Sequence, residues 1–236
     1  MNRKQLIDTA MGRKKAELVL RNARIVNVFT HEVIDGSLAI DQGYIVGIGA
    51  YEGQKEHDLG GRYLVPGLID SHVHIESSHV SPEQFAKLIV PRGTTTIVAD
   101  PHEIANVAGL DGIRFMIQAS RNLPLDVYFM LPSCVPATEF ENAGAVLNAE
   151  ALAELIDHES VLGLGEVMDY EAITAGNQDI LAKIDLAAKR GKPIDGHSPM
   201  LEGRGLSAYR AAGIMTDHEC SSLDEMRDRL RLGMHI

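Results

Sequence analysis

Alternation of apolar and polar residues dominates the N-terminal part of the chain. Leu18 and Leu20, and then Val26 and Val28, occupy every second position, which is the period of a strand with one buried face. Turn-forming residues such as Asp35-Gly36 separate these runs. The pattern predicts a short polar helix over 1–16 and a small antiparallel β unit with strands over 17–29, 33–40 and 44–49.

The pattern changes after Pro66-Gly67, where short apolar runs begin to alternate with stretches of helical periodicity. Ser81 as N-cap, Pro82 in the first turn and Gln84 closing a capping box predict that a helix starts at this point. Further helices are expected over 110–120, 149–157, 178–190 and 222–232. Strands are expected over 68–73, 94–99, 126–131, 161–165, 192–195 and 213–217. Repeated strand–helix units predict parallel strands joined by right-handed crossovers.

Two architectures satisfy this alternation, a doubly wound sheet and a (β/α)₈ barrel of the TIM type. The doubly wound sheet would be favoured by a glycine-rich phosphate loop, but neither G-x-G-x-x-G after the first strand nor G-x-x-x-x-G-K-[ST] occurs. The position of the polar residues favours the barrel. We therefore predict an α/β fold, with an incomplete barrel of about six strands over 67–236. Part of a small β-sandwich domain is expected over 1–66.

Ionisable and polar residues gather at the predicted C-terminal ends of the barrel strands, where barrel enzymes place their active sites. In chain order these ends carry His72 and His74, then Asp100, His102 and Glu103, then Ser133, Glu166, His197 and His218. Each residue alone has an ordinary explanation, such as a surface histidine or a carboxylate at a helix N-terminus. Ten histidines placed by chance would scatter, whereas five fall at successive strand ends. The sequence therefore predicts one shared site.

Four histidines and one carboxylate suit two divalent cations better than one, because a carboxylate can bridge two ions. The candidate ligands are His72, His74, Glu166, His197 and His218, whereas His102 either joins them or lines the mouth of the barrel. Mixed nitrogen and oxygen ligation favours manganese, iron or zinc over magnesium or calcium. Two ions about 3.5–4 Å apart can activate a water for attack on an electrophilic carbon, so the pattern predicts metal-dependent hydrolysis. The candidates to orient the imidazoles are Asp70, Asp195 and Asp217.

Composition narrows the classes of function. The chain has 22 Lys and Arg against 33 Asp and Glu, a formal net charge of −11 that disfavours binding to nucleic-acid phosphates. No apolar run approaches the ~18 residues of a membrane helix, and the N-terminal residues lack the apolar core of a signal peptide. Cys134 and Cys220 do not form a disulfide framework. We expect a cytoplasmic protein that acts on a small molecule, without a nucleic-acid or membrane partner.

Several segments resemble those of a known family. The block V-P-G-L-I-D-S-H-V-H over 65–74 is similar to the barrel entry of the amidohydrolase superfamily. More narrowly, five blocks resemble the bacterial adenine deaminase family: H-I-E-S-S (74–78), D-P-H-E-I-A-N-V (100–107), S-C-V-P-A (133–137), G-E-V-M-D-Y (165–170) and D-G-H (195–197). The resemblance implies that adenine and water are converted to hypoxanthine and ammonia. It implies a binuclear Mn²⁺ or Fe²⁺ centre, with Zn²⁺ as the alternative, and a homodimer.

The resemblance also implies roles for single residues. His72 and His74 would bind one ion, and Glu166 would bridge both ions as the catalytic carboxylate. His197 and His218 would bind the other ion. The expected substrate-binding residues are Glu76, Asp100, His102, Glu103 and Ser133.

The family pattern extends beyond the elements recognisable in this chain. The family's barrel has eight strands and takes a metal-binding, proton-shuttling aspartate from the eighth. We therefore expect 1–236 to be an N-terminal portion of a longer enzyme. By itself it should either fold poorly or pair with another polypeptide, and it should deaminate little, because an unclosed barrel leaves two strand edges unpaired. Two alternatives are another amidohydrolase acting on cyclic amides and an inactive fragment that retains the metal ligands. Glu166 in the place of a bridging lysine, together with the H-I-E-S-S block, argues against the first.

Overall fold

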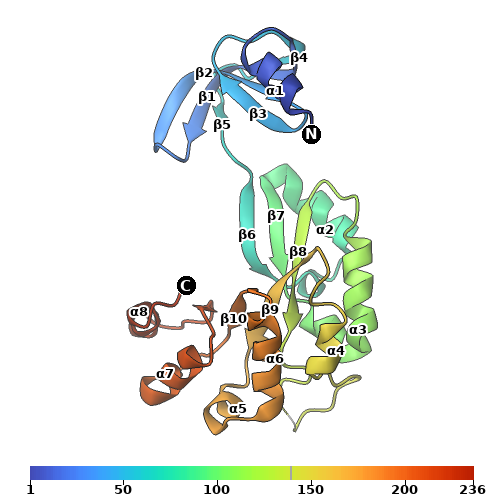
Figure 1. The fold of residues 1–236 in the computed structure, drawn as a ribbon, viewed down its shortest axis with the longest axis vertical. Coiled ribbons are helices and arrows are strands. Elements are labelled where there is room, and N and C mark those ends of the chain that lie inside the picture. Colours follow the sequence, from blue (N-terminus) through green and yellow to red (C-terminus); the bar gives the residue numbers. More distant parts are fainter. Residues whose placement is uncertain (139) are drawn as a thin grey trace. The chain divides into compact units, whose positions relative to one another are not determined.

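The structure of the chain, a computed structural model, describes residues 1–138 and 140–236. Contacts within the chain divide it into two compact units, Met1–Gly67 and Leu68–Ile236 (Figure 1).

The first unit is a helix followed by one mixed sheet. After α1 (Arg3–Ala10) come β1 (Ala16–Asn27), β2 (Glu32–Asp41), β3 (Tyr44–Ile48), β4 (Gly53–Asp58) and β5 (Tyr63–Leu64). The strand order is β3-β2-β1-β4, and β5 also pairs with β1. The three predicted strands pair antiparallel, but β4 and β5 run parallel to β1. The expectation of a purely antiparallel unit was therefore wrong, because β4 is polar and exposed along most of its length and gives no alternating pattern.

The second unit is a six-stranded parallel sheet whose strands lie in the order of the chain. The strands are β6 (Leu68–Val73), β7 (Thr94–Ala99), β8 (Asp126–Pro132), β9 (Val161–Val167), β10 (Ile194–Gly196) and β11 (Thr216–Asp217). A doubly wound sheet reverses its strand order at a switch point, and this sheet does not. The prediction of an incomplete TIM-type barrel is confirmed.

Helices connect successive strands of this sheet, and a last helix follows β11 (Figure 1). They are α2 (Pro82–Ile89), α3 (His102–Ala119), α4 (Ala149–Ala153), α5 (Tyr170–Ala175), α6 (Gln178–Ala188), α7 (Gly203–Ala211) and α8 (Leu223–Arg231), with short 3₁₀ turns η1 (Glu76–Ser78) and η2 (Val90–Arg92). Ser81 occupies the N-cap position of α2 as predicted, but its side chain makes no capping hydrogen bond. The pattern did not predict α5 and α7. No helix in the described ranges has both the length and the hydropathy needed to cross a membrane.

The main core lies between the sheet and its helices. Ile97, Phe129 and Leu164 from the strands are fully buried, as is Ile113 from α3. Burying a side chain of this size contributes about 1.5–3 kcal/mol, so the packing fixes the strands relative to one another. The last residues also join the sheet, since His235 forms an isolated parallel bridge with Thr216 of β11. The core thereby places the C-terminal ends of all six strands along one edge.

Candidate metal centre

Glu166 lies at the centre of a cluster of imidazoles. Its Oε1 atom is 3.0 Å from Nε2 of His72 and 3.0 Å from Nε2 of His218. The same oxygen is 3.5 Å from Nε2 of His74 and 3.5 Å from Nδ1 of His197. The structure therefore brings together all five residues that the sequence marked as candidate metal ligands.

The sheet explains why residues so distant in the chain meet. His72 is in β6 and His74 follows its end, two positions apart, so both side chains project to the same side of the strand. Glu166 lies near the end of β9, and His197 and His218 directly follow β10 and β11. Parallel strands in sequential order carry their C-terminal ends to one edge, which is where barrel active sites lie.

Three further ionisable residues border the cluster. Nδ1 of His102 is 2.8 Å from Oε2 of Glu166, closer than any of the expected ligands is to that carboxylate. His102 also lies 3.5 Å from Asp100, a carboxylate that is only 1% exposed. Glu103 lies 3.4 Å from Nδ1 of His74. Of the expected substrate-binding residues, these three are the ones that the structure places against the imidazoles.

Asp195 contacts the cluster from the side of β10. Its Oδ2 atom is 3.1 Å from Nδ1 of His218, the ring nitrogen opposite to the one that faces Glu166. A carboxylate in this position fixes the tautomer and the orientation of a metal-binding histidine. Asp217 instead pairs with Arg229, and Asp70 accepts a hydrogen bond from the backbone N–H of His72.

Neighbouring charges shift the pKa values of the carboxyl and imidazole groups of the cluster in opposite directions. Burial opposes ionisation of Glu166, yet the surrounding imidazoles outweigh it and hold the pKa of this carboxyl far below its usual range. Interactions with Glu103 and then Glu166 raise the pKa of His74 to about 11. Burial alone would lower the pKa of His218, but Asp195 and Glu166 raise it to about 10. Positive charge is therefore strongly favoured around Glu166, whether protons or metal ions supply it.

The donor atoms fit a pair of metal ions. Within the described residues, buried polar atoms without a hydrogen-bond partner include Oε2 of Glu166, Nδ1 of His197 and both carboxylate oxygens of Asp100. Unpaired buried groups cost about 1–3 kcal/mol each, and bound cations would satisfy donor atoms of this kind. Nε2 atoms of His72 and His74 also face each other at 3.0 Å.

In the part of the chain that the structure describes, three sets of donors contain Glu166: one with His72 and His74, one with His197 and His218, and one with Asp100 and His102. In the set of His72, His74 and Glu166, and in the set of Glu166, His197 and His218, the ligand atoms lie within 4.8 Å of one another. One carboxylate that belongs to both sets is the arrangement expected for a bridge. The mixture of imidazole nitrogen and carboxylate oxygen suits manganese, iron or zinc.

The remaining two expected substrate-binding residues make contacts of another kind. Glu76 accepts a hydrogen bond of 3.3 Å from the backbone N–H of Ile104, in the first turn of α3, and burial raises the pKa of this carboxyl. The Ser133 hydroxyl donates a hydrogen bond of 2.8 Å to the carbonyl oxygen of Glu166, and the serine is 1% exposed. Both side chains therefore contact backbone atoms beside the cluster.

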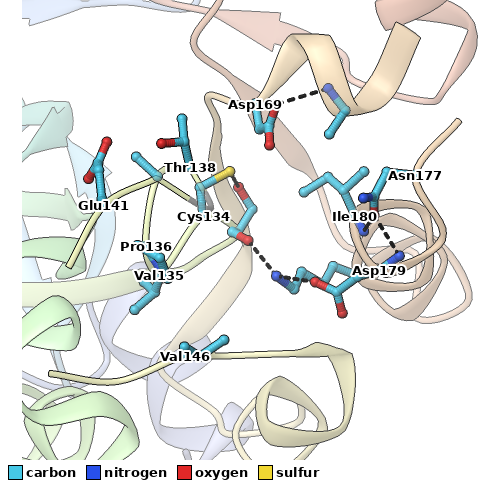
Figure 2. Close-up of a pocket in the computed structure, with 14 residues that line it drawn as sticks. Cys134, Val135, Pro136, Thr138, Glu141, Val146, Asp169, Asn177, Asp179 and Ile180 are labelled. Carbon is cyan, nitrogen blue, oxygen red and sulfur yellow. Dashed lines mark hydrogen bonds and ion pairs between the residues drawn. The ribbon is translucent and has the colours of Figure 1, made fainter. Parts of the chain in front are cut away.

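A cavity lies beside the segment that follows β8. Cys134, Asp169, Asn177 and Ile180 line it, and its volume is about 360 Å³ (Figure 2). Asp169 accepts a hydrogen bond from a backbone N–H of α5, and Asn177 caps α6. Lys183 also reaches this cavity, but its ammonium group already pairs with Asp179 at 2.7 Å and donates to the Ser133 carbonyl at 3.0 Å. The buried lysine therefore supports the segment after β8.

A model of the amidohydrolase family matches residues 63–236, which include the whole parallel sheet. The chain belongs to the amidohydrolase family. Similar proteins include the adenine deaminase of Clostridium acetobutylicum, 57% identical over 98% of this chain and 40% of that protein. The adenine deaminase of Nitratidesulfovibrio vulgaris is 58% identical over the same shares of the two chains. The chain spans about 40% of the length of these curated relatives.

Solved structures support the fold. The N-acyl-D-glutamate deacylase of Bordetella bronchiseptica superposes with a TM-score of 0.61 at 16% identity, over 92% of this chain and 55% of that one. The atrazine chlorohydrolase of Arthrobacter aurescens gives a TM-score of 0.58 at 13% identity, over 92% and 70%. At these identities the likeness concerns the architecture, and both of those structures were solved with zinc.

Proposed function

We propose that the protein catalyses metal-dependent hydrolytic deamination of adenine to hypoxanthine and ammonia. The observation that carries the proposal is the convergence of His72, His74, His197 and His218 on the buried carboxylate of Glu166. Identity of 49–58% with adenine deaminases over nearly the whole chain supports adenine as the substrate.

In this proposal His72 and His74 would hold one divalent cation, His197 and His218 would hold a second, and Glu166 would serve both. Manganese or iron is expected, with zinc as the alternative, because the donors are nitrogen and oxygen. When bound, the two ions supply the activation of water for attack on C6 of the purine. Ionised Glu166 suits the bridge, since its pKa is held below the usual range.

The residues around the ligands act on orientation and on protons. Asp195 holds the ring of His218 through Nδ1, and His102 approaches the second oxygen of Glu166. Burial raises the pKa of Asp100, so this carboxyl holds a proton to a higher pH than an exposed aspartate. Asp100, His102 and Glu103 are accordingly proposed to contact the purine or the leaving ammonia, whereas Glu76 and Ser133 act by supporting backbone.

The wider biochemical setting is part of the same proposal. Both cysteines are free thiols, which supports a reducing, cytoplasmic location. A homodimer is proposed from the resemblance to the family. The net charge of −11 argues against a nucleic-acid partner.

The test uses the protein expressed from its complete gene, stripped with a chelator and reloaded with Mn²⁺. Adenine should be converted to hypoxanthine with release of one ammonia, and Glu166→Gln should abolish both this conversion and tight metal binding. His57→Gln, at an exposed histidine of the first unit, is the control and should change neither. Hydrolysis of dihydroorotate without conversion of adenine would favour another cyclic-amide hydrolase. Absence of both reactions from metal-loaded protein would reject the proposed activity.

A further inference from the structure

The backbone is irregular at the residue proposed to bridge the ions. Between two paired positions β10 advances from Ile194 to Gly196, while β9 advances from Leu164 to Val167. Strand β9 therefore contains one extra residue, as in a β-bulge, a feature that is common beside active sites. Glu166 lies within this irregularity and has a φ of 29°, in the region that non-glycine residues rarely adopt.

Such a conformation costs about 1–3 kcal/mol and persists only where surrounding contacts hold it. The glycine before it is also constrained, because a Cβ at Gly165 would lie 2.2 Å from the carboxylate of Asp100. The local sequence G-E-V thus allows the turn but does not impose it. Contacts from other elements must hold the carboxylate of Glu166 in place.

Two buried hydroxyl groups make those contacts. Ser133, directly after β8, donates to the carbonyl oxygen of Glu166 at 2.8 Å. Tyr209, in α7, donates to the carbonyl oxygen of Val167 at 2.5 Å. The two successive peptide units that follow the Cα atom of Glu166 are therefore each held by a hydroxyl from a separate element.

Tyr209 also reaches the next strand. Its hydroxyl oxygen accepts a hydrogen bond of 3.0 Å from the backbone N–H of His197, so one phenol joins β9 to the end of β10. The residue is 0% exposed, and burial raises its pKa well above the ordinary value, so the hydroxyl keeps its proton and can donate. Gly196 leaves room for it, because a Cβ there would lie 2.8 Å from the Tyr209 oxygen.

We propose that Ser133 and Tyr209 are positioning residues whose hydroxyls set the carboxylate of Glu166 and the imidazole of His197 at the spacing that two cations require. The inference rests on the proposed function, since it takes Glu166 and His197 as metal ligands. Tyr209 is the more informative of the two, because its single oxygen contacts the backbone of His197 and that of Val167, the residue after Glu166. A role in folding alone would leave metal affinity unchanged in protein that is still folded.

Tyr209→Phe tests the proposal, because it removes one oxygen and keeps the ring in the core. The protein from the complete gene is stripped of metal and titrated with Mn²⁺ well below its melting temperature, with free Mn²⁺ read by EPR. We expect about 10–100-fold weaker binding of at least one of two ions, the usual effect of losing a group that supports a ligand. At saturating Mn²⁺ the spectrum of the coupled ion pair should also change.

Tyr128→Phe is the matched control, since Tyr128 lies in β8 away from its C-terminal end and is 36% exposed. It should bind Mn²⁺ as the unaltered protein does. Ser133→Ala is a second variant and should also weaken Mn²⁺ binding. If Tyr209→Phe does not fold, the Mn²⁺ affinity of Ser133→Ala tests the positioning role.

The outcomes separate the two proposals. Two Mn²⁺ ions bound by the unaltered protein, with affinity and spectrum the same in the folded variants, would overturn the positioning role and leave the proposed function standing. Failure of the unaltered protein to bind Mn²⁺, Fe²⁺ or Zn²⁺ would overturn the metal centre itself, and this inference with it.

Discussion

Replacing Arg229 with methionine should strongly destabilise the second unit. Arg229 lies in α8 with its side chain 0% exposed, and its Nε atom is 2.7 Å from Oδ2 of Asp217, which is also fully buried. The guanidinium also donates to the carbonyl oxygen of Glu225 at 3.3 Å and to the hydroxyl of Ser198 at 3.1 Å. Ser198 and Asp217 each adjoin a proposed metal ligand, so this network ties α8 to the ends of β10 and β11.

The magnitude follows from what the substitution leaves behind. Methionine fills much of the volume but leaves the Asp217 carboxylate buried without its cation. Breaking a buried ion pair in this way costs about 3–5 kcal/mol. Asp217→Asn combined with Arg229→Met should cost less than the sum of the single changes, because the second change removes the stranded charge.

The pH dependence gives a second measure. Burial opposes ionisation of Asp217, but Ser198 and Arg229 outweigh it and lower its pKa in the folded protein. The stabilisation is therefore present above the unfolded-state pKa of about 3.9 and is lost as pH falls through the lower folded value. In Arg229→Met burial should dominate and raise that pKa, so protonation relieves the variant. Its deficit relative to the unaltered protein should shrink between pH 7 and pH 4.

The assay is urea denaturation of the metal-stripped protein from the complete gene, followed by circular dichroism at several pH values. Arg227→Met is the matched control, because Arg227 lies on the same helix with its side chain 56% exposed and pairs with exposed Asp224. A surface pair of this kind contributes about 0–1 kcal/mol. If Arg229→Met cost no more than Arg227→Met, or if its deficit grew on acidification, the reasoning about the buried pair would be refuted.

Three further outcomes are expected. Asp195→Asn should weaken Mn²⁺ binding about 10–100-fold in a metal titration, because it alters the 3.1 Å contact that orients His218. Unchanged binding would contradict the role of Asp195 in orienting this ring. Lys183→Met should cost about 1–3 kcal/mol in urea denaturation by leaving a buried carbonyl unpaired, whereas exposed Lys189→Met should cost almost nothing. Metal uptake at pH 8 should release protons, because neighbouring carboxylates raise the pKa of His74 to about 11 and a bound cation would displace that proton. Calorimetry should then give binding heats that depend on the buffer, and heats independent of the buffer would contradict this proton release.

Regular elements with strong periodicity were predictable, and weak ones were not. The strand Thr94–Ala99 was predicted with its correct bounds because a run of β-branched residues favours a pleated, buried surface. Helix α7 was missed because its sequence G-R-G-L-S-A-Y-R-A contains two glycines and a serine, which lower helix propensity. Its helical conformation depends on Leu206 and Tyr209, which pack into the core.

Two buried residues that support the candidate site were not predicted. Tyr209 contacts Val167, 42 positions earlier in the chain, and Arg229 contacts Ser198 at a separation of 31. Neither residue stands at a strand end or in a recognisable spacing, so no local signal distinguishes them from an ordinary core tyrosine or a surface arginine. Arg229 is fully buried, which is unusual for an arginine. Helix periodicity does not predict the burial of a charged residue.

The sequence by itself determined the architecture of the second unit and the members of the candidate metal centre. Repeated strand–helix units require parallel strands, and parallel strands carry their C-terminal residues to one edge, so His72, His74, Glu166, His197 and His218 had to approach one another. Tertiary structure decided how they approach. The extra residue at Glu166, the contact from His102 and the hydroxyl of Tyr209 between two strands depend on register and packing across distant segments, which no local pattern encodes.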